Sequence, residues 1–592
     1  MRRTSLVLIA IWAFASGCAQ PAAAPPSIAV PAPASVGRPS LQPRTPLLDR
    51  PWSTDQRKFT FSVIGDKAGG GGSWSFFDRS VDEINLLRPD FAIMVGDLIQ
   101  GSTWGPLRLP EQWEEFGAHA GRLVVPLFIL PGNHDVGGTP THNAWWRQHI
   151  GRTYYSFEHE GCLFIALNTE EMHYPGPGGF GEQQVRFVLD ELAAHRDLRH
   201  AFLFMHHPAW ASPTHADEWR RIEAALGNRA YTVFAGHWHQ LRYEKRNDHR
   251  YIVLGPTGAG LDPSEVPMLG LFHHHTVVTV DGDSAYIAYL EPGGAMWPVD
   301  VAQPGFALAA DRVVATEALP AAGLSTGNIT AGLATKLVND LPDTVVVVRR
   351  IGRLRGGWRL VEGPDSATVV LPPGARAEMV ARYAGPVTSL PSVPQVAYDV
   401  TYGGKKLFSS ARDVPLVPDA VLRHPPDWEV IGPFALGEQQ FRAIPDYRRA
   451  FPRMYERLGP EIGWSRDATI SDGDTGLAWR HVAAGATGLV QLSSDPAMAP
   501  PQYVIGDALC AVYSPTDRVA LAEFRASIFG QIVVNGRMVD DGQLYRGNYV
   551  AVPLAAGWNQ VLVKVLNVTG GWSFSLRFAD PDGELRFAPH LE

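Results

Sequence analysis

Cysteine is scarce in this sequence of 592 residues, which contains only 3: Cys18, Cys162 and Cys510. Cys18 lies in an N-terminal segment of its own, and the other two fall in different predicted domains. A framework of disulfides is therefore excluded as the source of stability, even in an oxidising compartment. Positive charge is not in excess either, because the net charge is -9 at pH 7. Since a surface that binds nucleic acid must neutralise phosphates, no nucleic acid is expected as the main partner.

The N-terminus contains an apolar run, Leu6–Phe14, that is too short for a membrane span. Arg2 and Arg3 precede this run and the segment "ASGC" follows it, which predicts an export signal over residues 1–18. "ASGC" resembles a bacterial lipoprotein cleavage box with Cys18 as the acylated residue. The alternative is a plain secretory signal that contains Cys18. We expect an exported protein of the cell envelope, periplasmic or at the surface, with a lipid on Cys18 as its attachment to the membrane.

Glycine and proline are abundant, with 59 and 48 residues, and their distribution divides the chain. Residues 19–50 form a Pro/Ala-rich linker that cannot build a core. Over residues 51–305, apolar strand-like runs alternate with helical stretches, which predicts an α/β domain. Beyond it, β-branched runs are split by Gly/Pro turns. This pattern predicts two β-sandwich domains, an immunoglobulin-like one over residues 306–418 and another over residues 419–592.

Polar side chains with metal-binding atoms follow the predicted strands of the α/β domain. The segments are "VIGD", "VGDL", "PGNHD", "FMHHP" and "AGHWH", and the candidates are Asp66, Asp97, Asn133, His134, His206, His237 and His239. Because ligands gather at the carboxyl ends of strands in an open α/β sheet, we expect these side chains to meet in one crevice. Carboxylate and amide oxygens mixed with imidazoles suit divalent manganese, iron or zinc. The set is too large for one four-coordinate ion and suits two, with Asp97 as the bridge; such a pair can drive displacement at phosphorus.

The ordered set "GD…GD…GNHD…HHP…GHWH" resembles the calcineurin-like metallophosphoesterase superfamily, from about residue 58 to residue 290. The resemblance implies a sheet sandwich flanked by helices. It implies that Asp66, Asp97 and His239 bind a first metal ion. It implies that Asp97, Asn133, His206 and His237 bind a second one. His134 is implied to contact the phosphoryl oxygen or to protonate the leaving group, with Asp135 holding its ring.

The stretch "GDKAGGGG", residues 65–72, departs from the pattern of this superfamily. The first motif of the superfamily is usually Asp-x-His, and Ala68 stands where the histidine is expected. We therefore expect a weakened first metal site, with Lys67 as a fixed cation or an extra water nearby. The glycines do not match a Walker loop, which needs Lys-Ser or Lys-Thr after its last glycine, or a dinucleotide fingerprint. The loop is interpreted as a metal loop, not as a phosphate cradle.

Several other features leave alternatives open. His207 is taken as a neighbour of the site, with its role and that of His206 interchangeable. The tract His273–His275 is interpreted as the solvated start of a strand, and Asn168–Glu171 either faces the crevice or forms a surface loop. The segments "WEVIGPF", "IVVNGRMV" and "GGWSFSLRFAD" resemble galactose-binding-like β-sandwiches. Trp558 and Trp572 are interpreted as core residues there, and a glycan-binding face is the alternative.

Taken together, these features predict an exported phosphoric ester hydrolase that uses a metal-bound hydroxide on a phosphate mono- or diester. The alternative is a cell-surface binding protein, with glycan as a candidate ligand, whose phosphoesterase domain is degenerate and inactive. Ala68 favours this alternative, whereas the intact "GNHD" and "GHWH" segments favour the enzyme.

Overall fold

The computed structural model describes residues 58–101, 108–137, 140–171, 179–324, 327–352, 354–388, 395–414, 416–435, 469–472, 475–492, 504–544, 548–567 and 572–591. The predicted export signal, with Cys18, and the predicted linker over residues 19–50 lie outside the described residues. Within these ranges, no helix combines the length and the apolar composition that a membrane span requires. Cys162 and Cys510 are both free and buried.

The first sheet of the α/β region has six strands in the order β12-β11-β10-β1-β2-β3. Its strands are β1 (Lys58–Ile64), β2 (Phe91–Met94), β3 (Leu127–Ile129), β10 (His275–Asp281), β11 (Ser284–Leu290) and β12 (Met296–Pro298). The neighbours β1, β2 and β3 are parallel, and β10 pairs with β1 antiparallel. The parallel strands therefore end at the same edge of the sheet.

The second sheet also has six strands, in the order β4-β5-β6-β7-β9-β8. Its strands are β4 (Tyr155–His159), β5 (Cys162–Ala166), β6 (His200–Phe204), β7 (Tyr231–Ala235), β8 (Arg242–Arg246) and β9 (His249–Val253). The strands β5, β6, β7 and β9 are parallel neighbours. The apolar runs with few alternating polar residues are typical of parallel strands that are covered on both faces.

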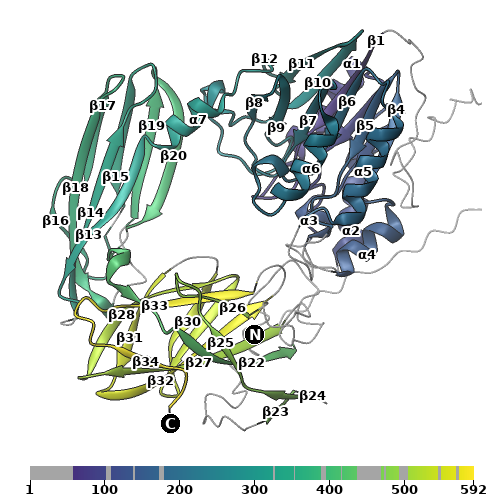
Figure 1. Ribbon diagram of the computed structural model, residues 1–592. Helices are drawn as coiled ribbons and strands as arrows, with labels where there is room; N and C mark the ends of the chain where they lie inside the picture. Colours follow the sequence, from purple (N-terminus) through teal and green to yellow (C-terminus); the bar gives the residue numbers. More distant parts are fainter. Residues whose placement is uncertain are drawn as a thin grey trace, which may run out of the picture. The chain divides into compact units, whose positions relative to one another are not determined.

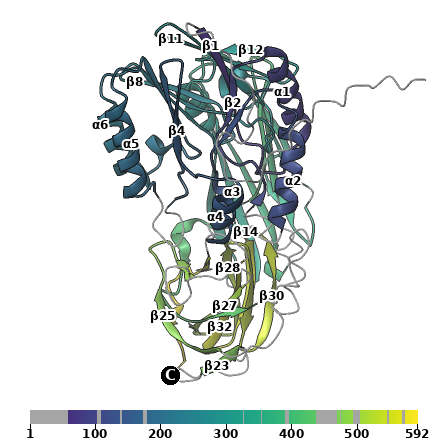
Figure 2. The same ribbon diagram turned by 90° about the vertical axis from the view of Figure 1, so that its right-hand side faces the viewer.

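The two sheets pack face to face through an aromatic core. Phe61 of the first sheet lies with its ring centroid 5.3 Å from that of Phe164 and 5.0 Å from that of Phe202, both in the second sheet. The helices α1 (Trp74–Leu87) and α2 (Leu109–Ala120) cover the outer face of the first sheet, and α5 (Glu182–Ala194) and α6 (Ala216–Leu226) cover that of the second. Figure 2 shows these helix pairs on opposite sides of the sheets. This arrangement is the predicted sheet sandwich flanked by helices.

The sequence of α1 explains how such a helix forms. Its buried residues Phe77, Val81 and Ile84 recur at the spacing of one helical face. The Ser73 hydroxyl caps the start by accepting the Ser75 N–H, and Arg88 ends the helix in a left-handed conformation at φ 50°. The short helices α3 (Asn133–Val136) and α4 (Pro140–His149) follow β3.

Among the described residues beyond the α/β region, antiparallel strands follow the helix α7 (Pro304–Asp311) (Figure 1). One four-stranded sheet has the order β13-β14-β18-β16 and the other β17-β15-β19-β20. Their strands are β13 (Val314–Ala322), β14 (Asn328–Val338), β15 (Val345–Ile351), β16 (Arg359–Glu362), β17 (Ser366–Leu371), β18 (Arg376–Pro386), β19 (Gln395–Tyr402) and β20 (Lys405–Asp413). Leu333 and Val347 belong to one apolar core that both sheets share.

The last block contains a five-stranded and a seven-stranded sheet. Their strands are β21 (Leu422–Arg423), β22 (Asp427–Ala435), β25 (Arg480–Ala483), β26 (Leu489–Gln491), β27 (Val504–Ser514), β28 (Arg518–Ala526), β29 (Phe529–Val534), β30 (Arg537–Leu544), β31 (Asn548–Leu554), β32 (Gly557–Asn567), β33 (Ser573–Ala579) and β34 (Arg586–Ala588), with β23 (Thr469–Asp472) and β24 (Thr475–Ala478) as a separate pair. The predicted hairpin turn joins β29 to β30, with Asn535 and Gly536 at φ 49° and 76°.

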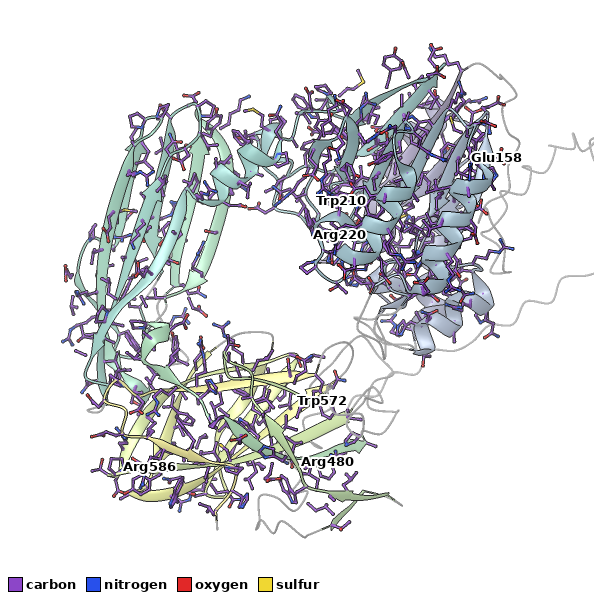
Figure 3. The ribbon with its side chains drawn as sticks, in the orientation of Figure 1. Glu158, Trp210, Arg220, Arg480, Trp572 and Arg586 are labelled. Atoms are coloured by element: carbon purple, nitrogen blue, oxygen red, sulfur yellow. The ribbon has the colours of Figure 1, made fainter. Side chains whose placement is uncertain are left out.

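The two tryptophans predicted to lie in the core of this block differ. Trp572, labelled in Figure 3, is buried and donates its Nε1–H to the Val565 carbonyl at 3.1 Å. Trp558 is 45% exposed, so the prediction that it is a core residue is wrong. Its ring lies against Tyr513, with 5.5 Å between the ring centroids.

Candidate metal centre

The predicted ligands come from loops that follow strands of both sheets. Asp66 follows β1, Asp97 follows β2, and Asn133 begins α3 after β3. His206 follows β6, and His237 and His239 follow β7. Hydrogen bonds join these loops across the two sheets: the His237 N–H donates to Asp66 Oδ2 at 2.8 Å, and the His206 ring lies 3.0 Å from the Val95 carbonyl. The structure therefore brings all six predicted ligands together at one edge.

Asp66, Asp97 and His239 form one group able to hold a cation, with their ligand atoms within 4.8 Å of one another. His239 Nε2 lies 3.3 Å from Asp66 Oδ2, and its Nδ1–H donates to the Gly260 carbonyl at 3.1 Å. This second bond fixes the ring so that Nε2 faces the carboxylates. These are the residues predicted for the first metal ion.

His206, Asn133 and His237 form a second group. His206 Nε2 and His237 Nδ1 lie 2.8 Å and 3.0 Å from Asn133 Oδ1. His206 Nε2 also lies 3.3 Å from Asp97 Oδ2, and its Nδ1–H donates to the Val95 carbonyl. Asp97 therefore lies between the two groups, in the position predicted for a bridging carboxylate.

The charges in the centre depend on one another. Burial alone would raise the pKa of Asp97, but the neighbouring His206 and His134 outweigh it and hold that pKa below its usual range. Burial alone would lower the pKa of His206, but the Asp97 carboxylate raises it to about 10. Burial, together with His206, lowers the pKa of His237 to about 3. A neutral His237 offers a free electron pair, and a cation bound here would compete with the proton on His206.

The backbone of the centre is strained at several of these residues. Asp97, His237 and His239 have φ angles of 54°, 72° and 52°, in the left-handed region that side chains other than glycine rarely adopt. Each such residue costs about 1 kcal/mol or more, and such strain gathers at functional sites. Gly132 lets the chain pass close by, because a Cβ added there would lie 2.3 Å from Asp97 Oδ1.

His134 lies beside the metal groups and faces the same space. Its backbone N–H donates to Asp97 Oδ1 at 2.9 Å, and its ring Nδ1 lies 3.2 Å from the Gln100 carbonyl. Because that carbonyl can only accept, Nδ1 is the donor in this contact. A Cβ added to Gly69 would lie 3.4 Å from His134 Nε2 and 2.9 Å from His239 Cε1, so both rings border Gly69.

Asp135 does not hold the His134 ring, and the prediction of a catalytic role for it is wrong in that respect. Its Oδ1 accepts the N–H groups of Leu98 and Ile99 at 2.9 Å and 3.1 Å, and its Oδ2 accepts the Gly132 N–H at 2.8 Å. Asp135 thus fixes the loop that carries Asp97. The Gln100 carbonyl, which the sequence did not indicate, contacts the His134 ring instead.

His207 and Glu170 flank the second group, which agrees with the prediction that His207 is a neighbour of the site. His207 Nε2 lies 2.8 Å from Glu170 Oε1, and the His207 and His237 ring centroids are 3.7 Å apart. His207 also forms a group of possible ligand atoms with His206 and His237. The sequence leaves two alternatives open for Asn168–Glu171, and Glu170 faces the crevice. The feature of the sequence that indicates this position is the acidic pair that follows β5.

The histidine tract at the start of β10 is not solvated as predicted. His274 and His275 are buried, because β10 lies between β1 and β11 inside the first sheet. Burial lowers the pKa of His274 to about 3 and that of His275 to about 4. Both side chains are therefore neutral core residues at neutral pH.

The loop with Ala68 borders both the metal groups and a cavity. The N–H groups of Lys67 and Ala68 donate to the Asp97 carbonyl at 3.0 Å and 2.7 Å, which ties the loop to the centre. The Lys67 ammonium lies 3.7 Å from the Trp74 ring centroid, and burial lowers its pKa to about 8. A cavity of about 490 Å³ adjoins this lysine; its lining residues are Lys67, Gly70, Gly71, Gly72, Trp74, Leu98, Ile99, Gln100, Gln112, Glu115 and His134.

Comparison with known proteins finds a family profile that matches the segment containing this site. The calcineurin-like phosphoesterase profile matches residues 59–241. Serine/threonine-protein phosphatase CPPED1 of Homo sapiens is 30% identical over 200 residues, which cover 30% of this chain and 63% of that protein. The Bos taurus protein of that name is 29% identical over 202 residues, covering 30% and 64%. The chain thus spans less than two thirds of the length of these relatives.

Among solved structures, Vps29 of Entamoeba histolytica complexed with zinc aligns with a TM-score of 0.22 and 13% identity, over 41% of this chain and 99% of that one. All the predicted site residues fall inside the segment that the family profile matches. Residues 59–241 therefore carry a calcineurin-like phosphoesterase domain.

Proposed function

We propose that this chain is an exported, metal-dependent hydrolase that cleaves a phosphate mono- or diester at a two-metal site. The observation that carries the proposal is the buried Asp66 carboxylate. Its Oδ1 is buried and has no hydrogen-bond partner among the described residues. Leaving a buried charged oxygen without a partner is costly, by about 1–3 kcal/mol or more, unless a cation binds it. The neighbouring imidazoles and carboxylates supply the other ligands of such a cation.

The donor set fits two divalent ions. Asp66, Asp97 and His239 would hold the first, and Asp97, Asn133, His206 and His237 the second. Oxygen and imidazole donors together suit manganese, iron or zinc. When bound, the ions activate a water molecule and stabilise charge on the phosphoryl oxygens. The first ion has one protein ligand fewer than the superfamily pattern, because Ala68 offers no donor.

The chain's own residues position the substrate and move the proton. The Gln100 carbonyl holds the Nδ1–H of His134, so its Nε2 faces the space that His239 borders. From there Nε2 can contact a phosphoryl oxygen or give a proton to the leaving alcohol. Asp135 acts indirectly, since its carboxylate holds the backbone N–H groups of Leu98 and Ile99 next to Asp97. It is a positioning residue.

The name of the curated relatives supports the phosphoester class. CPPED1 is described as a serine/threonine-protein phosphatase, and a phosphorylated serine or threonine side chain is a monoester. We carry over the reaction class and leave the substrate open between monoesters and diesters. The rest of the proposal concerns the remainder of the chain: an immunoglobulin-like sandwich over residues 306–418 and a galactose-binding-like sandwich over residues 419–592, the latter a candidate glycan-binding module.

A substrate panel tests the hydrolase directly. Purified protein loaded with manganese is assayed on aryl phosphate monoesters and diesters, nucleotides and phospholipid head groups. Asp97→Asn, which weakens both metal groups, should lower turnover more than about 100-fold. The matched control is Asp248→Asn, an exposed carboxylate that pairs with Lys245 and should have no effect. Full metal loading without hydrolysis of any ester would refute the hydrolase and favour the alternative, a binding protein with an inactive phosphoesterase domain.

Export and anchoring have their own test. Expressed in a bacterial host, the full chain should partition with membranes, and Cys18→Ser should release it or leave it unprocessed. Recovery of the wild type entirely as soluble protein would refute the lipid anchor.

A further inference from the structure

The cavity beside His134 is bounded by elements that are distant in the sequence. Trp74 begins α1, Gln112 and Glu115 belong to α2, and Lys67 and Gly70–Gly72 come from the loop after β1. The helices α1 and α2 lie side by side on the outer face of the first sheet (Figure 2). His134 lines both this cavity and the space next to His239. A group attached to a phosphoester at the metal centre could therefore extend into it.

Lys67 places an unpaired positive charge in this cavity. The residue is only 5% exposed, and its ammonium lies over the Trp74 ring. It forms no ion pair or hydrogen bond within the part of the chain that the structure describes. A buried ammonium without a carboxylate partner is unusual, because burying a charge is costly unless it is paired. An anionic ligand would supply the missing partner.

Gln112 adds a second unpartnered donor. This residue is 4% exposed, and its Oε1 accepts the Gly101 N–H at 2.8 Å. Because a backbone N–H can only donate, this bond fixes which end of the amide is the oxygen. The other end, Nε2, is buried and bonds to nothing in the described ranges. Buried amide donors almost always have a partner, so this one indicates a ligand acceptor.

The glycine-rich loop contributes further donors. The backbone N–H groups of Gly70 and Gly71 bond to no acceptor among the residues that the structure describes. Gly70 and Gly71 have φ angles of 61° and 82°, and successive N–H groups in such conformations form concave anion sites. Trp74 is not free to stack on a ligand ring. Lys67 lies within 4 Å of its ring centre, and His119 stacks 3.9 Å from it, so they occupy opposite faces.

From these donors we propose that the cavity is an anion subsite next to the metal centre. The preferred substrate is then a phosphoester whose alcohol part carries a second anionic group, a carboxylate or another phosphate. This inference rests on the proposed function, because it names the substrate class of the same site. Among the described residues that line the cavity, Glu115 alone is acidic, and its Oε1 accepts the Trp74 Nε1–H at 2.8 Å. It holds the ring under Lys67 and weakens the attraction for an anion.

The first experiment measures binding without turnover. Calorimetry on the metal-loaded protein compares propylphosphonate, 3-phosphonopropionate and propane-1,3-diphosphonate, with two- and four-carbon homologues. The wild type should bind at least one of the doubly anionic compounds about 10- to 100-fold more tightly, as expected for a bond between charged groups. Comparison of 3-phosphonopropionate with propane-1,3-diphosphonate shows whether the cavity prefers a carboxylate or a second phosphate-like group. Equal affinity for all three compounds would overturn the proposal.

Variants locate the preference within the cavity. Lys67→Met and Gln112→Glu should each remove the preference, whereas Glu115→Gln should increase it. The matched control is Lys245→Met, an exposed lysine that pairs with Asp248 and should leave the preference unchanged. Because Lys67 is next to the predicted metal ligand Asp66, the metal content of each variant is measured as well. The readout is the ratio of the affinity for the doubly anionic compound to that for propylphosphonate. A preference that survives both Lys67→Met and Gln112→Glu would overturn the assignment to this cavity.

Turnover separates this inference from the proposed function. The ratio of kcat/KM for 2-carboxyethyl phosphate to that for propyl phosphate should follow the ratio of affinities. Hydrolysis of both esters without a preference refutes the subsite and leaves the hydrolase standing. A binding preference without any hydrolysis supports the subsite and refutes the hydrolase. Binding of no phosphonate at all refutes both.

Discussion

Replacing Asp66 by asparagine should release the first metal ion and spare the second. Asp66 Oδ2 already accepts the His237 N–H, and an amide oxygen can keep that bond. The buried Oδ1 has no partner in the described part of the chain, and the substitution would put a neutral group in its place. The structure therefore predicts that the loop geometry survives while the ionic ligand is lost.

The magnitude follows from the role of this oxygen. Substitutions in the supporting shell of a metal site typically weaken metal binding about 10- to 100-fold, and loss of a direct ligand should cost at least that much. The second group keeps Asp97, Asn133, His206 and His237, so its affinity should change little. Ala68→His is the converse change, since it restores the donor that the superfamily pattern has at this position. It should tighten the first site, provided that the imidazole fits where the buried methyl group now lies.

The assay is metal stoichiometry after matched dialysis of the wild type, Asp66→Asn and Ala68→His. The wild type should lose its first ion before its second, Asp66→Asn should retain about one ion per chain, and Ala68→His should retain two for longest. If all three proteins retain the same metal with the same affinity, Asp66 is not a ligand, and its buried carboxylate needs another explanation.

Three further predictions concern other residues of the domain. His134→Ala should lower turnover about 10²- to 10⁴-fold with normal metal content; a parallel loss of metal would show that His134 is a ligand. Asp135→Asn leaves one side-chain oxygen to accept N–H groups that two oxygens accept in the wild type. Thermal unfolding should therefore show that the free energy of unfolding falls by about 2–4 kcal/mol. An unchanged unfolding temperature would contradict the positioning role of Asp135. In the folded protein, burial lowers the pKa of His274 to about 3 and that of His275 to about 4, whereas the unfolded value is about 6.5. The unfolded state therefore binds more protons below about pH 6.5. The free energy of unfolding should fall as the pH drops from about 6.5 to about 4, by about 1.4 kcal/mol per pH unit for each histidine. Denaturant unfolding of His275→Gln across this range should show a shallower slope than the wild type, and equal slopes would argue against a neutral buried His275.

The position of the metal centre could be predicted from the sequence because its residues directly follow strands whose ends meet at one edge. Asp66, Asp97 and His206 each follow a buried apolar run, and parallel strands bring such positions to one edge. What Asp135 contacts could not be predicted in this way. Its carboxylate bonds to the N–H groups of Leu98 and Ile99, which become its neighbours only when β2 and β3 pair.

Burial was hardest to predict where composition and topology disagree. The tract His273–His275 looks solvent-exposed by composition, but β10 occupies an interior position of its sheet, and strand order is not readable from a local pattern. Lys67 is a similar case. Trp74 and Gln112, which line the same cavity, come from α1 and α2, so no local sequence pattern indicates that the three residues meet.

Metal titration of turnover tests the central claim most directly. Metal-free protein is titrated with manganese while bound metal and the hydrolysis of an aryl phosphate are measured on the same sample. The two-metal account predicts negligible hydrolysis without metal and a rate that rises until about two ions are bound per chain. Saturated metal binding with no hydrolysis, or hydrolysis that does not depend on metal, would contradict it.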